Sequence, residues 1–157
     1  MTADKVGSYL IMPHKKLILE YYNGKINMSD LIHFKRIISK DPDHNFYFNT
    51  IIDFRDAELM IGKNELDALL AFFRRKFKVS GTRNVAYLTS APKEVVITKL
   101  FSLLANEYAD LRFNLQTFST IEAVSGWFSS VSVPYETLKS SLQELKDDSE
   151  NVFGKSR

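Results

Sequence analysis

The stretch Thr50-Ile-Ile-Asp-Phe-Arg-Asp56 decides the fold, because an apolar run ends there in three charged side chains. Asp53, Arg55 and Asp56 fall within four residues of the chain. In an α/β domain this pattern is typical of a buried parallel strand at the point where it leaves the sheet. Ligands and partners of such sheets usually gather at that edge. The stretch therefore predicts where the protein acts, but it does not say on what it acts.

The composition is that of an ordinary single domain. A chain of 157 residues is long enough to bury a sizeable core. The absence of Cys excludes disulfides, a thiolate nucleophile and a cysteine-ligated metal site. No apolar run reaches the roughly 20 residues of a membrane-spanning helix. Residues 1–7 also lack the apolar region of a signal peptide, so we expect a cytoplasmic location.

The charge balance gives little support to nucleic-acid binding. The net charge is +2, whereas a duplex-binding domain normally carries a clear basic excess on one face. The densest basic cluster is Arg74-Arg75-Lys76 with Lys78. We interpret this cluster as the solvated face of a helix near its C-terminus, with a surface for acidic lipid or nucleic acid as the alternative.

Apolar periodicity divides the chain into alternating strands and helices. The expected strands are 8–12, 17–22, 46–54, 85–88 and 115–118; the first two form a hairpin, and Asn23-Gly24 supplies a turn after it. Asn27, Asn64 and Ser119 are candidate helix caps. A further helix is expected at 93–108, and the side chains predicted to face its core are Val96, Leu100, Leu103 and Leu104.

This order of elements predicts an α/β fold with a mostly parallel five-stranded sheet. The N-terminal hairpin is antiparallel, and helices pack on the sheet. We expect a domain over 7–131, an extra amphipathic helix over 132–146 and a disordered tail over 147–157. Leu138, Leu142 and Leu145 lie at helical spacing, so that last helix either docks on its own domain or makes a dimer or partner contact.

The chain resembles the SpoIIAA-like branch of the STAS/SEC14-type domains, which are small α/β modules of bacteria. The segments that carry the resemblance are Lys16-Leu-Ile-Leu-Glu-Tyr-Tyr-Asn-Gly24, Ile51-Ile-Asp-Phe-Arg-Asp56, Asn84-Val-Ala-Tyr-Leu-Thr89 before Pro92, and Phe118-Ser-Thr-Ile-Glu-Ala123 before Trp127. The resemblance covers about 9–130. It implies a binding or regulatory module without catalysis, which docks a protein partner near the loop after the third strand.

The same resemblance implies a phosphorylatable Ser in that loop, within an Asp-Ser-Ser-Gly-like motif. This chain has Arg55-Asp-Ala-Glu-Leu-Met-Ile-Gly62 there, and no Ser or Thr occurs between Thr50 and Ser80. The phosphorylation switch therefore does not carry over. The SEC14-like side of the kinship implies a small apolar or lipid-like ligand.

The residues themselves leave several kinds of chemistry open. Asp53 and Asp56 could contact a ligand or partner, or they could serve a hydrolytic or metal-dependent reaction. The third alternative is structural: Asp53 caps a neighbouring loop or pairs with Arg55 at the sheet edge. Thr89-Ser90, between a strand and a helix, suits either an anion or simple capping. The three histidines lack metal-ligand spacing, and no serine elbow, dinucleotide loop or Walker A loop is present.

We therefore predict a non-catalytic interaction module with no cofactor. It would bind a protein partner, or itself as a homodimer, through the loop and helix after the third strand. The candidate contact residues are Asp53, Arg55, Asp56, Gly62, Asn64, Thr89 and Ser90. The alternatives are a carrier of a small apolar or lipid-like ligand and an enzyme that uses Asp53 and Asp56.

Overall fold

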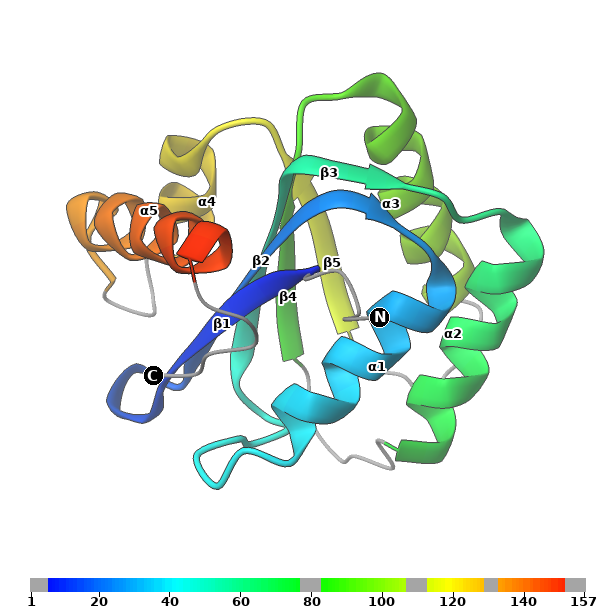
Figure 1. The fold of residues 1–157 in the computed structure, drawn as a ribbon, viewed down its shortest axis with the longest axis horizontal. Helices are drawn as coiled ribbons and strands as arrows, with labels where there is room; N and C mark the ends of the chain where they lie inside the picture. The colour runs from blue at the N-terminus through cyan, green and yellow to red at the C-terminus, as the bar shows by residue number, and fades with distance from the viewer. Residues whose placement is uncertain (1–5, 77–82, 107–112, 129–132, 152–157) are drawn as a thin grey trace.

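The computed structural model describes residues 6–76, 83–106, 113–128 and 133–151 (Figure 1). Its elements are β1 (Gly7–Met12), the 3-10 turn η1 (Pro13–Lys15), β2 (Leu17–Ile26), α1 (Met28–Ser39), β3 (Asn49–Leu59), α2 (Lys63–Lys76), β4 (Arg83–Leu88), α3 (Pro92–Asn106), β5 (Phe113–Phe118), α4 (Ile121–Trp127) and α5 (Tyr135–Asn151). The strands form one sheet in the order β1-β2-β3-β4-β5. β1 is antiparallel to β2, and the other neighbours are parallel. The predicted fold class is confirmed.

Two layers of helices cover the sheet, as Figure 1 shows. The face under α1, α2 and α3 carries one buried cluster, which includes Tyr22, Ile52 and Tyr87. The face under α4 and α5 carries a second cluster, which includes Leu19 and Ile51. Neighbouring residues of each strand belong to different clusters, because side chains alternate between the two faces of a sheet. Both faces are buried, so the strands have no polar side over most of their length.

The hairpin forms as predicted, but its second strand is longer than expected. The turn uses Lys16 in the left-handed region, with φ 51°, and the Lys16 N–H donates to the carbonyl of Pro13. Asn23-Gly24 lies within β2 rather than in a turn after it. Gly24 has φ +76°, a conformation that glycine adopts without a steric penalty. β2 therefore continues through Ile26 beside β3.

Of the three predicted helix caps, one is confirmed. Asn27 accepts a hydrogen bond from the N–H of Asp30, whose carboxylate accepts one from the N–H of Asn27, and these bonds form a complete capping box. Asn64 lies inside the first turn of α2, because the helix already begins at Lys63. The cap of α4 is Thr120 rather than Ser119. The Thr120 hydroxyl accepts a hydrogen bond from the backbone N–H of Ala123.

α5 docks on its own domain, which decides between the two interpretations of its apolar stripe. Leu138, Leu142 and Leu145 are buried against the second cluster. The hydroxyl of Ser8 in β1 donates to the carbonyl of Leu145 at 2.6 Å. The helix extends to Asn151, beyond the expected end at 146, and the remainder of the predicted tail lies outside the described residues.

The predicted core side of α3 is confirmed in part, since Leu100 and Leu104 are partly buried against the first cluster. The buried residues of α3 are Glu94, Thr98, Phe101 and Ala105. Val96 and Leu103, which the spacing places in the core, are 65% and 66% exposed. Hydrogen bonds to the sheet fix this orientation of α3. Glu94 accepts one from the N–H of Leu59 at 3.1 Å, and the Thr98 hydroxyl lies 2.9 Å from that of Thr117.

No helix in the described part of the chain is both long and apolar enough to cross a membrane.

Candidate functional site

β3 does not leave the sheet after Asp56, as its sequence predicts, but continues to Leu59. The run of charges marks a β-bulge instead. Tyr21 pairs with Asp53, and Asn23 pairs with Asp56. Between these two pairs the chain advances by two residues on β2 but by three residues on β3. One extra residue in β3 shifts the alternation of side chains by one position. Asp53 and Asp56, which a regular strand would point to opposite faces, therefore lie on the same face, under α4 and α5.

Asp53 is fully buried and its carboxylate is fully used by Arg55. One oxygen accepts from the backbone N–H and from Nε of Arg55, each at 3.0 Å, and the other accepts from Nη2 at 2.8 Å. This two-pronged hydrogen bonding raises the pKa of Arg55 above its ordinary value, although partial burial opposes the shift. The predicted pairing of Asp53 with Arg55 is present in the structure.

Asp56 is only partly buried and has two partners from other elements. Its Oδ2 accepts from the Tyr21 hydroxyl at 2.6 Å and lies 3.4 Å from Nζ of Lys146 in α5. Partial burial favours the neutral acid, but the hydrogen bond from Tyr21 and the charge of Lys146 outweigh it. The pKa of Asp56 is therefore held below its usual value. Asp56 is a carboxylate at neutral pH.

These side chains line a polar pocket of about 230 Å³, which we call the bulge pocket. Its lining residues are Tyr21, Asp53, Arg55, Asp56, Ile121, Lys139, Leu142, Gln143 and Lys146. The pocket lies between the β2–β3 pair and the two helices of the second layer. Among the described residues, no group of three or more His, Asp or Glu side chains is arranged to hold a metal ion.

The other four predicted contact residues do not line the bulge pocket. Gly62 and Asn64 are exposed at the start of α2, where the N–H of Gly62 donates to the carboxylate of Glu65. Thr89 is buried after β4 and Ser90 is exposed beside it. The structure thus brings together Asp53, Arg55 and Asp56, but leaves the other predicted residues elsewhere.

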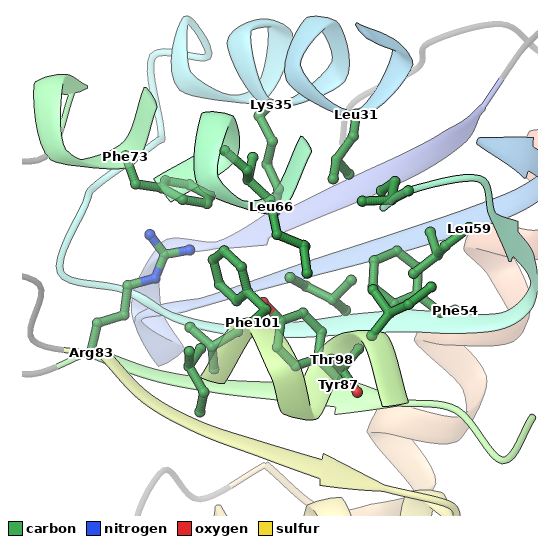
Figure 2. A pocket seen from close by; sticks show the side chains of 16 residues that line it. Leu31, Lys35, Phe54, Leu59, Leu66, Phe73, Arg83, Tyr87, Thr98 and Phe101 are labelled. Atoms are coloured by element: carbon green, nitrogen blue, oxygen red, sulfur yellow. The ribbon is translucent and has the colours of Figure 1, made fainter. Parts of the chain in front are cut away.

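A second, apolar pocket lies on the other face of the sheet, beneath α1, α2 and α3 (Figure 2). Its cavity volume is only about 50 Å³, enough for a few water molecules. Aromatic and aliphatic side chains form most of the wall, among them Phe54, Phe73 and Phe101. Figure 2 shows two cations at its rim, Lys35 from α1 and Arg83 from the start of β4.

A buried polar network stands beside this apolar pocket. Glu20, 2% exposed, accepts hydrogen bonds from the Tyr22 hydroxyl and from the ammonium of Lys35. Arg83 donates to the hydroxyl of Thr50 at 2.6 Å. Burial lowers the pKa of Lys35 and of Arg83, and it raises the pKa of Tyr22 well above 10.

The apolar surface nearest to the predicted contact region is on α3. Val96 and Leu103 are exposed on the side of α3 that faces away from the core, and Met60 is exposed close to the beginning of that helix. Leu100 lies between Val96 and Leu103 and is partly buried, in contact with the first cluster. The Nζ of Lys93 lies 3.7 Å from the sulfur of Met60, so the two segments meet. We call Met60, Val96, Leu100 and Leu103 the α3 strip.

Comparisons with known proteins add one structural neighbour. No model of a known protein family matches the chain, and no curated protein matches it. The crystal structure of an uncharacterized protein of the DUF3478 family, from Shewanella loihica PV-4, is described as having a SpoIIAA-like fold. It is 11% identical, covers 71% of this chain and 82% of its own, and has a TM-score of 0.46.

Sequence reasoning missed the part of the bulge pocket that α5 supplies. Lys139, Gln143 and Lys146 each follow an apolar residue of the predicted stripe by one position. They therefore form a parallel polar stripe along the helix. That pattern is visible in the sequence, but only the docking of α5 shows that this polar stripe faces Asp53 and Asp56 of β3 across the bulge pocket.

Proposed function

We propose that this chain is a non-catalytic interaction module that binds a protein partner through the α3 strip. The observation that carries the proposal is the exposure of two apolar side chains of α3 that the spacing predicts to be buried. Val96 and Leu103 face solvent, while Glu94 and Thr98 face the core. A helix that is apolar on both sides is normally covered on both sides.

Helical geometry makes the strip continuous. Residues at i, i+4 and i+7 fall on one face of an α-helix, so Val96, Leu100 and Leu103 line up along about two turns. Met60 extends the strip at the end where Lys93 approaches it. The loop after β3, predicted as the contact region, thus adjoins the strip, whereas the exposed residues of α2 are mostly polar.

The charges beside the strip favour a different protein over a second copy. The exposed charged side chains of α3 are Lys93, whose Nζ lies 3.7 Å from the carboxylate of Glu58, and Lys99, which has no ion pair among the described residues. A two-fold contact would place this face against itself and bring like charges together. We expect a partner that presents an apolar surface with acidic residues at its margins.

The alternative functions receive less support from the geometry. An acid–base or metal role for Asp53 requires a free carboxylate, but Arg55 occupies both of its oxygens. A lipid-like ligand requires a cavity of several hundred Å³, and the apolar pocket has about 50 Å³. A lipid would have to separate the helices from the sheet to enter.

A site-specific crosslinker tests the proposal. A photoreactive amino acid at position 103 should capture a protein in cells of the source organism, and the same group at Ala71, exposed on α2, should not. The captured protein is then purified and its affinity for the whole chain measured. Leu103→Glu should weaken binding at least about tenfold, because it places a charge in the apolar contact.

Ala71→Glu is the matched control, since it adds the same charge on the neighbouring helix. It should leave the affinity unchanged. The proposal fails if both positions crosslink the same protein equally, if no protein is captured from position 103, or if the two substitutions weaken binding alike.

A further inference from the structure

The bulge pocket lies on the opposite face of the sheet from the α3 strip, so its use is independent of the proposed partner contact. Three of its charged residues are cations, and two are carboxylates. Asp53 is neutralised by Arg55, and Asp56 is paired with Lys146. Lys139 remains: within the described chain its ammonium approaches only the ring of Tyr135, at 5.9 Å.

The arrangement therefore has one positive charge in excess at a concave surface. Arg55 is 39% exposed and Lys146 is 41% exposed, so both cations also reach the open side of the pocket. Because the edge of Arg55 that carries Nε and Nη2 is already bound to Asp53, the cations available to a ligand act mainly as point charges. Lysines bind phosphate in this way, whereas the two-pronged guanidinium contact, which suits both carboxylates and phosphates, is not available at that edge of Arg55.

The rest of the pocket is suited to a small organic group that bears hydroxyls. Ile121 and Leu142 supply an apolar floor. The amide nitrogen of Gln143 donates to the carboxylate of Asp147 at 3.0 Å, which leaves its Oε1 as an acceptor at the pocket. Asp56 uses only Oδ2 with Tyr21 and Lys146, so its second oxygen is also an acceptor. A volume of about 230 Å³ is below that of pockets for drug-sized ligands.

We propose that the bulge pocket binds a small phosphomonoester that carries hydroxyl groups, such as a sugar phosphate. The phosphate lies among Lys139, Lys146 and Arg55. The hydroxyl groups donate to Asp56 and Gln143, and the carbon skeleton rests on Ile121 and Leu142. The proposal concerns binding alone.

Calorimetric titration of the whole chain with glucose 6-phosphate tests the site. We expect saturable binding that weakens as salt is added, because the charged groups are partly exposed to solvent. Inorganic phosphate should bind more weakly and glucose should not bind. Amide chemical shifts recorded in the same titration should move at positions 55, 56, 139 and 146.

A charge-matched pair of variants locates the site. Lys139→Glu should weaken binding about tenfold or more, while Lys40→Glu, an exposed lysine at the end of α1, should not. Both variants change the net charge of the chain equally. Lys139→Arg should retain binding, because it keeps the positive charge.

Three results would each overturn the proposal. The first is no saturable binding of glucose 6-phosphate at millimolar concentration, with the protein folded by circular dichroism. The second is equal weakening by Lys139→Glu and Lys40→Glu, which would mean a general effect of net charge. The third is equal affinity for glucose 6-phosphate and inorganic phosphate, which would mean that the floor and the hydroxyl contacts contribute nothing.

Discussion

At the scale of single residues, the pair of Asp53 and Arg55 has an asymmetric role. Asp53 is fully buried, whereas Arg55 is partly exposed. A buried carboxylate without its partner is costly, because the charge has lost its water and gained nothing in return. Replacing Arg55 alone should therefore lower the stability of the fold more than replacing both residues, although the two share the same hydrogen bonds.

Arg55→Gln should lower the free energy of unfolding by about 3 kcal/mol, at the low end of the range for a broken buried pair because water reaches Arg55. The double variant Asp53→Asn with Arg55→Gln should recover at least about 1 kcal/mol of that loss, since no charge is left in the interior. Urea unfolding at neutral pH gives the free energy of unfolding of the wild type, of each single variant, Asp53→Asn included, and of the double variant. Strictly additive effects of the two substitutions would contradict this account of the pair.

At the scale of elements, α3 shows how buried hydrogen bonds choose the face that a helix presents to the core. The apolar residues of α3 occupy both sides, so apolar spacing alone supports two orientations. Glu94 and Thr98 select one of them, because their partners lie on β3 and β5. If the helix were turned the other way, the N–H of Leu59 and the hydroxyl of Thr117 would lose these partners, and that cost opposes the gain from burying Val96 and Leu103.

Leu103→Asn should therefore change the free energy of unfolding by less than about 0.5 kcal/mol, the usual range for an exposed position. Phe101→Ala, two residues away but buried, should cost about 3–5 kcal/mol. Thermal and urea unfolding of the two variants decide the orientation of the helix. A loss from Leu103→Asn as large as that from Phe101→Ala would place Leu103 in the core after all.

The sequence predicts most elements because their signals are local. The hairpin, the cap at Asn27 and the apolar stripe of α5 each depend on residues close together in the chain. The bulge in β3 could not be predicted, because it is defined only by pairing with Tyr21 and Asn23 of β2. The bulge pocket was half predicted: its β3 residues are adjacent in sequence, but its lysines come from a helix at the far end of the chain.

At the scale of the whole molecule, the sheet is stable only with its second layer in place. α5 covers side chains of β2 and β3 such as Leu19 and Ile51, which are buried in the described structure. Without the helix those strands would expose a contiguous apolar face of the kind that promotes aggregation.

A chain that ends at residue 133 should therefore lose cooperative unfolding and aggregate on purification. A chain that ends at 151 should unfold like the full-length protein, because it retains α5. Size-exclusion chromatography and thermal unfolding of the two truncations make the comparison. If the shorter chain is monomeric and unfolds cooperatively, the first layer of helices alone is sufficient for the fold.

The hydrogen bond from Ser8 to Leu145 joins the first strand of the sheet to its last helix, and this has a consequence for synthesis on the ribosome. The interior strand β2 emerges about 120 residues before α5, the helix that covers it. At about 5–20 residues per second, that interval is roughly 6 to 24 seconds. During that time one side of the nascent sheet is bare, so the growing chain is a natural substrate for a ribosome-associated chaperone until its final turns appear.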